Sequence, residues 1–278
     1  MSHNTIGFLH SYFPNLRWAV SKWWYEKLSS LDLDTNMIFM NYGYADIDPH
    51  GKQLPLETQD EDNRYCIQHY HHVATAVDLK GLDVLEICSG RGGGASYITR
   101  YLQPKSLIGY DITANAISFC NRHYSVDGLS FIRGDSRYLP FVSNAFDAIV
   151  NIEASGYPNM ARFYSEVNRV LKPGGHFLNS DFRKDHEIDP WRSEIKASGL
   201  KLVKEEDITP NVVRALELDN DRKQQLINQY APKILRKAVF EFAGVTNTNY
   251  AYGAFKARQK LYLHFVSRKP EINYSNAN

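Results

Sequence analysis

The sequence has no long hydrophobic run and no excess of charge of either sign. No stretch of about eighteen consecutive apolar residues, the length that a membrane-spanning helix needs, occurs in the chain. The first residues, MSHNTIGFLHSYFPNL, have neither the basic start nor the apolar run of a secretory signal. The net charge is only +1, which argues against general nucleic-acid binding. We therefore expect a soluble, cytoplasmic protein with no stable membrane insertion and no nucleic-acid partner.

The chain also contains few cysteines. Cys66, Cys88 and Cys120 are odd in number and form no C-x-x-C pair, so neither a disulfide framework nor a zinc site is indicated. We expect no bound metal. In contrast, 43% of the 278 residues are hydrophobic and 13% are aromatic. That content is ample for a core and fits one large α/β domain with an added segment, or two small domains.

Glycine is concentrated in one stretch, residues 82–94, LDVLEICSGRGGG. Val84, Leu85 and Ile87 predict a short buried strand, the glycines a loop, and the following ASYITRYL a helix. Glycines leave the backbone bare where the strand turns into the helix, so a ligand can lie against the peptide N–H groups. The stretch indicates a site for a nucleotide-type cofactor.

Strand and helix signals alternate from this point onward. Strands are predicted at residues 83–88, 106–110, 129–133, 148–152, 176–180, 200–203 and 261–266, and helices at 94–102, 115–124 and 161–171. Such alternation is typical of a Rossmann-like, doubly wound α/β fold with a mostly parallel sheet, here of seven strands.

Helical segments flank this predicted sheet. Residues 60–76 and the long stretch 208–258 have helical patterns, whereas 37–55 indicates a loop. Residues 7–29 carry three tryptophans at helical spacing and predict a helix that packs on the core or acts as a lid over a substrate pocket. We divide a single domain over residues 1–278 into a helical lid (1–80), a cofactor-binding core (81–207), a helical cap insertion (208–258) and the last strand (259–269).

Two cofactor classes use such a glycine loop. The spacing Gly90-x-Gly92-x-x-Ala95, with Asp111 19 residues after Gly92, matches a dinucleotide fingerprint and would suit an NAD-dependent oxidoreductase. Glu86 argues against it, because a carboxylate beside the loop repels a pyrophosphate and attracts a cationic cofactor. Asp135, after the third strand, suits an adenine amino group.

The segments FDAIVNIEAS and LKPGGHF, separated by a helix, resemble those of class I S-adenosylmethionine-dependent methyltransferases. This resemblance covers residues 82–182. The segments MIFMNYGY, LPLE, DNR and GGGASYITR, together with Tyr70-His71, are similar to the phthiotriol/phenolphthiotriol dimycocerosate methyltransferases and related natural-product O-methyltransferases, from about residue 25 to 266.

The resemblance implies S-adenosyl-L-methionine as cofactor and assigns its contacts. The acid of the first strand and the glycines (Glu86, Gly90, Gly92) would hold the methionine moiety, the second acid (Asp111) the ribose, and the third (Asp135) the adenine. The implied cofactor-binding residues are Glu86, Cys88, Gly90, Gly92, Asp111, Ile112, Asp135, Ser136 and Asn151, the last through nearby main chain. Cys88 replaces the family's usual first glycine, but the remaining glycines can still make the turn.

Methyl transfer requires alignment of the acceptor with the methyl carbon, and an aliphatic hydroxyl also needs a base. Ligands of open α/β sheets lie beyond the carboxyl ends of the strands, where Glu153 and Asp181 are candidates; His71 could approach from the preceding helix. Many relatives carry a histidine shortly after the Glu-Ala-Ser of the fourth strand, but this chain has Gly156 there. Either another residue is the base, or the acceptor needs little deprotonation.

The predicted function is O-methylation of a hydroxyl on a hydrophobic small molecule, such as a polyketide, lipid, glycolipid or phenolic. Tyr157, Tyr250, Tyr252 and Phe255 could line an apolar acceptor site. C-methylation, cyclisation or cofactor binding without transfer remain alternatives, as does the less favoured oxidoreductase. A hydrophobic acceptor is the expected partner, and a homodimer is left open.

Overall fold

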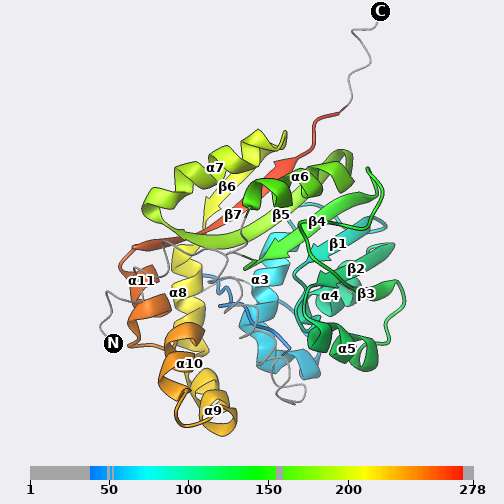
Figure 1. The fold of residues 1–278 in the computed structure, drawn as a ribbon. Helices are drawn as coiled ribbons and strands as arrows, with labels where there is room; N and C mark the ends of the chain where they lie inside the picture. The colour runs from blue at the N-terminus through cyan, green and yellow to red at the C-terminus, as the bar shows by residue number, and fades with distance from the viewer. Residues whose placement is uncertain (1–37, 49–50, 52, 155–158, 272–278) are drawn as a thin grey trace, which may run out of the picture.

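The computed structural model describes residues 38–48, 51, 53–154 and 159–271 (Figure 1). One sheet runs through these residues in the strand order β3-β2-β1-β4-β5-β7-β6. Its strands are β1 (Asp83–Ile87), β2 (Ser106–Asp111), β3 (Leu129–Arg133), β4 (Phe146–Ile152), β5 (Leu171–Lys184), β6 (Lys201–Asp207) and β7 (Lys260–Arg268). Only β7 pairs antiparallel with its neighbours, β5 and β6. The predicted Rossmann-like, mostly parallel sheet is confirmed.

Helices cover both faces of the sheet (Figure 1). α3 (Arg64–Ala74), α4 (Gly93–Tyr97) and α5 (Ala114–His123) lie on one face, and α6 (Met160–Val170) and α7 (Ile188–Ala197) lie on the other. A 3-10 turn (η2, Thr58–Asn63) precedes α3, a π-helical turn (η3, Ile98–Leu102) continues α4, and a 3-10 turn (η4, Asp185–Glu187) precedes α7.

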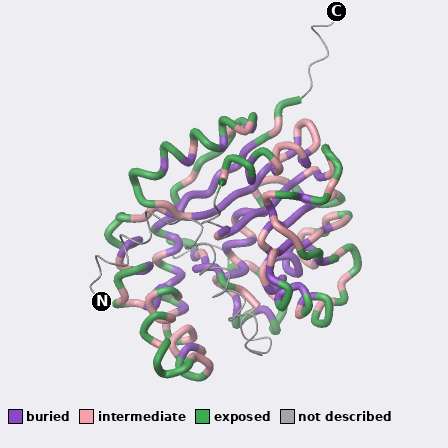
Figure 2. The backbone as a smooth tube through the Cα atoms, in the orientation of Figure 1, coloured by how far each residue is buried: buried purple, intermediate pink, exposed green. Residues whose placement is uncertain are grey.

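Each central strand contributes to two cores. In β1, Val84 packs under α3 and α4, while Leu85 and Ile87 pack under α6 and α7. Successive side chains of a strand point to opposite faces of the sheet, and helices on both faces leave every position buried. Figure 2 shows the result as a fully buried sheet centre. The strands are apolar at nearly every position because helices cover both faces of the sheet.

The helical cap lies between β6 and β7 in the chain. It consists of α8 (Thr209–Leu218), α9 (Asn220–Tyr230), α10 (Arg236–Ala243), a π-helical turn (η5, Asn249–Gly253) and α11 (Ala254–Lys256). α8 and α11 pack on the sheet through Val212, Leu216, Phe255 and Tyr262. α9 and α10 project away and consist mostly of half-buried and exposed residues (Figure 2). The helical insertion predicted at 208–258 is present.

Three local details differ from the sequence predictions. Strand β5 begins at Leu171, before the strand predicted at 176–180, and includes Pro173-Gly174-Gly175. Gly174 has φ +79° and its N–H donates to the Lys269 carbonyl, so these residues form an irregular strand start. Helix α7 was not predicted. The single helix expected at 94–102 is divided between α4 and η3.

Parts of the predicted lid and pocket lie outside the described residues. These include the helix at 7–29, Gly156 and Tyr157. The described part of residues 37–55 forms neither helix nor strand, as predicted. No helix among the described residues has the length and apolarity to cross a membrane.

Candidate active site

The three predicted cofactor carboxylates lie at one edge of the sheet. Glu86 is near the end of β1, Asp111 ends β2, and Asp135 follows β3 by two residues. Because these strands are parallel, their carboxyl ends meet at the same edge. Glu86 and Asp111 are close enough for the charge of Asp111 to act on Glu86.

Glu86 is buried against helix α3. It is only 1% exposed, and its Oε1 accepts a hydrogen bond of 2.8 Å from the Tyr70 hydroxyl. Gly94 makes this contact possible, because a Cβ there would lie 1.9 Å from the Tyr70 ring. Burial raises the pKa of Glu86 to about 8, the charge of Asp111 adds to the rise, and the Tyr70 hydroxyl opposes it. A cation beside Glu86 would favour its ionised form.

Asp111 fastens the glycine loop. Its Oδ2 accepts from the Gly90 N–H at 3.0 Å, and its Oδ1 accepts from the Thr113 N–H at 2.7 Å. Burial raises the pKa of Asp111, and these backbone donors oppose the rise. The carboxylate therefore sets the shape of the loop as well as presenting charge there.

Cys88 and the glycines give the loop its sharp path. Cys88, Gly90 and Gly92 all have positive φ, of +63°, +52° and +77°. The N–H groups of Cys88 and Ser89 both donate to the Tyr110 carbonyl, which ties the loop to β2. A left-handed backbone is unfavourable for a residue with a Cβ. This explains physically why glycine suits position 88 and shows that cysteine retains the turn.

The remaining predicted cofactor residues differ in what they offer. Asp135 is partly buried and forms an ion pair of 2.6 Å with Arg137. Ile112 accepts a hydrogen bond from Arg133 Nε at its carbonyl. The Asn151 side chain donates to the Ile87 carbonyl and accepts from Asn179, so it connects β1, β4 and β5 instead of facing a ligand.

Two buried hydroxyls at this edge are free to bind a ligand. The Oγ atoms of Ser89 and Ser136 are buried and have no hydrogen-bond partner among the described residues. Buried polar groups normally have partners, so these hydroxyls and the carboxylates nearby fit a cofactor that offers both hydrogen-bonding groups and positive charge.

A segment that we call the strap, residues 38–45, crosses from the glycine loop to the cap. At the loop, a Cβ on Gly93 would meet the Phe39 ring at 2.9 Å. In the middle, the Tyr42 N–H donates to Glu153 Oε1 at 2.6 Å. At the cap, the Tyr42 hydroxyl donates to the Phe242 carbonyl at 2.9 Å. The strap thus contacts the glycine-loop region, Glu153 and the cap.

Glu153 follows β4 at the centre of this arrangement. Its φ is +53°, a left-handed conformation held by a hydrogen bond from its N–H to the Ser180 carbonyl. Its Oε1 accepts from both the Tyr42 N–H and, at 2.8 Å, the Tyr262 hydroxyl. Burial raises the pKa of Glu153 to about 8, with a further rise from Asp181 and an opposing effect of Lys223.

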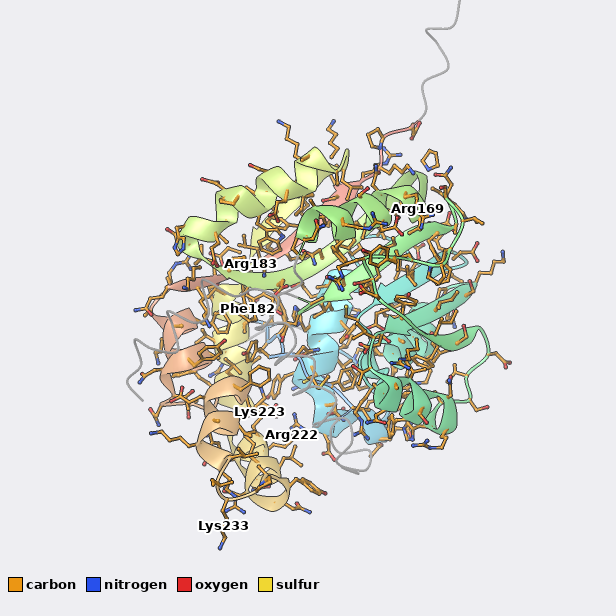
Figure 3. The ribbon with its side chains drawn as sticks, in the orientation of Figure 1. Arg169, Phe182, Arg183, Arg222, Lys223 and Lys233 are labelled. Carbon is orange, nitrogen blue, oxygen red and sulfur yellow. The ribbon has the colours of Figure 1, made fainter. Side chains whose placement is uncertain are left out.

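Lys223 approaches Glu153 from the cap. Its Nζ donates to the Tyr42 carbonyl at 3.3 Å, and burial lowers its pKa. Figure 3 shows Lys223 and Arg222 between the cap and α3. Lys223 of α9 therefore reaches the strap close to the carboxyl group of Glu153.

The other two predicted catalytic residues have different partners. His71 Nδ1 lies 2.7 Å from the Tyr97 hydroxyl of α4, and burial lowers the pKa of His71. Asp181 is 2% exposed, accepts from the Phe182 N–H, and forms an ion pair of 3.3 Å with Arg183. No hydrogen bond joins either residue to Glu153.

His69, which was not predicted as a site residue, contacts two residues that bond to Glu153, namely Ser180 and Tyr262. Its Nε2 is 2.9 Å from Ser180 Oγ, and its ring packs edge-on against Tyr262 at 5.3 Å. The buried positions of α3 (Cys66, Ile67, His69, Tyr70, Val73, Ala74) follow a helical period. His69 belongs to this buried face and His71 does not. The helical period was therefore the feature of the sequence that could have pointed to His69.

Comparison with known proteins identifies the family. Residues 85–179 match the model for a methyltransferase domain. Over 230 residues, 82% of this chain and 84% of the relative, the chain is 40% identical to the phthiotriol/phenolphthiotriol dimycocerosates methyltransferase of Mycobacterium tuberculosis. The chain belongs to the S-adenosylmethionine-dependent methyltransferases. The predicted family and cofactor are confirmed, and the oxidoreductase alternative is rejected.

Two further similarities bear on this methyltransferase. It is 40% identical to a fatty-acid O-methyltransferase of Mycolicibacterium smegmatis over 204 residues, which cover 73% of this chain and 74% of that one. Its fold matches that of the geranyl diphosphate C-methyltransferase from Streptomyces coelicolor, solved with Mg2+, geranyl diphosphate and S-adenosyl-L-homocysteine. The TM-score is 0.61 at 16% identity, with 88% of this chain and 97% of that chain covered.

Proposed function

We propose that this methyltransferase transfers a methyl group to an oxygen of a hydrophobic small molecule, with Glu153 as the base. Two relatives, each 40% identical, carry names that refer to lipids, and one of these names specifies O-methylation. The single observation that carries the proposal for this chain is the environment of Glu153: a carboxyl group at the end of β4 that accepts hydrogen bonds from the strap and from Tyr262.

The residues for cofactor binding are those at the ends of β1 to β3. Glu86 would face positive charge, Asp111 would hold the ribose hydroxyls and Asp135 the adenine, with Ser89 and Ser136 as further donors. S-adenosyl-L-methionine supplies a methyl group already activated by the positive charge on sulfur. The chain's remaining tasks are to align the acceptor and to take up its proton.

Glu153 suits that second task. A base is most effective when its pKa is near the working pH, and burial raises the pKa of Glu153 to about 8. The Tyr42 N–H and the Tyr262 hydroxyl fix the position of Oε1. Glu153 would accept the hydroxyl proton of the acceptor, while Asp181 and His71, bonded elsewhere, would support the fold.

The cap and the strap are proposed to cover the acceptor. Phe255 and Tyr262 are buried where the cap meets the sheet, and Tyr262 donates to Glu153, whereas Tyr250 is exposed. An apolar cover and a near-neutral chain support a small hydrophobic acceptor over a nucleic acid. We also propose that the enzyme is cytoplasmic. We include the lid, residues 1–80, in the same single domain.

The test is a methyl-transfer assay with S-adenosylmethionine labelled in the methyl group. The acceptors are a long-chain fatty acid, a long-chain secondary alcohol, an alkyl phenol and an isoprenoid with an activated carbon. We expect label in the ester or ether products. Label only in a carbon–carbon product, or binding of S-adenosylhomocysteine without transfer to any acceptor, would contradict the proposal and support C-methylation or a non-transferring protein.

A further inference from the structure

A cluster of potential metal ligands lies between α3 and the sheet, apart from the residues of the candidate active site. His72 of α3, Glu206 of β6 and His264 of β7 come from three separate elements and meet on one face of the sheet. His72 Nε2 is 3.1 Å and His264 Nδ1 is 3.8 Å from Glu206 Oε2. One ligand atom from each of the three lies within 4.8 Å of the other two.

His264 is the unusual member of this cluster. It is completely buried, and neither ring nitrogen has a hydrogen-bond partner among the described residues. Burying an imidazole without partners is costly. Its ring lies edge-on to that of His72, with 5.3 Å between the ring centres. The free ring nitrogens of a buried histidine, facing a second histidine and a carboxylate, therefore point to a missing partner.

A metal ion would satisfy these groups with little rearrangement. Bonds of about 2.0–2.1 Å to tetrahedral Zn2+ place two ligand atoms about 3.3 Å apart. The separations of 3.1 Å and 3.8 Å are close to that value, and the ligand atoms of His72 and His264 are at most 4.8 Å apart. His72 and Glu206 are partly exposed and can adjust, which also gives an ion access from solvent.

The surroundings of the three side chains also suit a bound divalent ion. A divalent ion binds histidine as the neutral imidazole and glutamate as the carboxylate, so the three side chains offer a suitable set of ligands. Tyr44 stacks on His72 at 4.3 Å and fixes its ring. Lys204 is the one competitor among the described residues: its Nζ lies 2.8 Å from Glu206 Oε2, and its side chain is half exposed and free to move away.

We propose that His72, Glu206 and His264 bind a divalent transition-metal ion, with Zn2+ as the best match, which fastens α3 to β6 and β7. Two histidines and one carboxylate are a common ligand set for such ions. The ion would take no part in methyl transfer. It would stabilise α3, the helix that brings Tyr70 to Glu86 and His69 to Ser180. We expected no bound metal from the sequence, because residues 72, 206 and 264 lie too far apart in the chain to be recognised as one ligand set.

The experiment uses the full chain, dialysed against a chelator and titrated with ZnCl2 in competition with a chromophoric chelator. CoCl2 is used in parallel, because tetrahedral Co2+ absorbs visible light. We expect one ion per chain and a rise in Tm of several degrees on Zn2+ addition. His72→Ala and Glu206→Gln should each weaken binding at least tenfold and abolish the rise in Tm.

Two further variants sharpen the test. His186→Ala, an exposed histidine outside the cluster, should bind as tightly as the wild type. Lys204→Ala should bind Zn2+ more tightly, because the competing ammonium group is gone. The proposal is wrong if the wild type binds no ion, or if His72→Ala and Glu206→Gln bind as tightly as the wild type. His72 and Glu206 are partly exposed, so these conclusions do not depend on the stability of a variant at the buried His264.

Discussion

The two halves of the site are built in different ways. In the cofactor half, Glu86, Asp111 and Asp135 lie in or just after three successive strands. Their partners are 16, 21 and 2 residues away in the chain, namely Tyr70, Gly90 and Arg137. In the acceptor half, Glu153 depends on Tyr42 and Tyr262, which are 111 and 109 residues away in the chain. One half is therefore held by contacts that are local in sequence, and the other by contacts between segments far apart in the chain.

Because of this difference, we expect substitutions in one half to impair methyl transfer and substitutions in the other half to impair cofactor binding. The largest expected effect is on methyl transfer, in the acceptor half. Glu153→Gln keeps the shape of the side chain but removes the base, so kcat should fall by about 10²–10⁴ while the Kd of S-adenosylhomocysteine stays the same. In the wild type, kcat/KM should fall as the pH drops below about 8, the value to which burial raises the pKa of Glu153. Steady-state rates and calorimetry measure both quantities.

Glu194→Gln, at an exposed position of α7, is the matched control and should behave as the wild type. An unchanged kcat in Glu153→Gln would exclude Glu153 as the base. A large loss of cofactor affinity in the same variant would show that the two halves are not separable.

The cofactor half should show the converse defect. Asp111→Ala removes the acceptor of the Gly90 and Thr113 N–H groups. We expect about 10–100-fold weaker binding of S-adenosylhomocysteine, since hydrogen bonds to charged groups contribute about 1.5–3 kcal/mol. Isothermal titration measures the Kd, and kcat at saturating cofactor should change much less. Asp127→Ala, at an exposed position, is the control; equal Kd values for the two variants would refute a role for Asp111.

The buried acid of the cofactor half should also make stability depend on pH. The pKa of Glu86 is about 8 in the folded protein and 4.5 as its ordinary value. A raised acid pKa means that the folded state binds more protons, so the contribution of Glu86 to stability is complete below about pH 4.5 and is lost as the pH rises through 8.

Glu86→Gln cannot ionise and should escape this loss. Relative to the wild type, its free energy of unfolding should rise by up to about 1.4 kcal/mol per pH unit between pH 5 and 8, as measured by urea denaturation. Glu194→Gln should show no such trend. A constant difference between Glu86→Gln and the wild type across that range would contradict the raised pKa.

The smallest expected effect tests the backbone of the glycine loop. Cys88 has a φ of +63°, and relief of a left-handed conformation is worth about 1–2 kcal/mol, less the added freedom of glycine in the unfolded chain. Cys88→Gly should therefore raise the free energy of unfolding by about 0.5–1 kcal/mol. Cys88→Ala, which removes the thiol but keeps the strain, should not; equal stabilisation by both variants would rule out backbone strain as the cause.

The same contrast explains what the sequence could and could not predict. Strands, the glycine loop and the strand-end acids depend on residues close in sequence, and β1 to β4 lie within two residues of the predicted bounds. His69, Tyr42 and Tyr262 were missed as partners of the Glu153 region because the rotation of α3 and the path of the strap depend on packing against distant elements. The start of β5 at Leu171 was missed because Pro173 and the two glycines after it usually end an element, whereas here an irregular pairing accommodates them.

The strap also has a consequence for the binding of the two ligands. The same short piece of irregular chain contacts the loop that would hold the donor, the proposed base Glu153, and the cap that is proposed to cover the acceptor. A ligand that pulls the strap toward one end changes the affinity at the other end by the same factor that it experiences in return. Donor and acceptor are therefore expected to change each other's affinity, so the Kd of one ligand should depend on whether the other is bound.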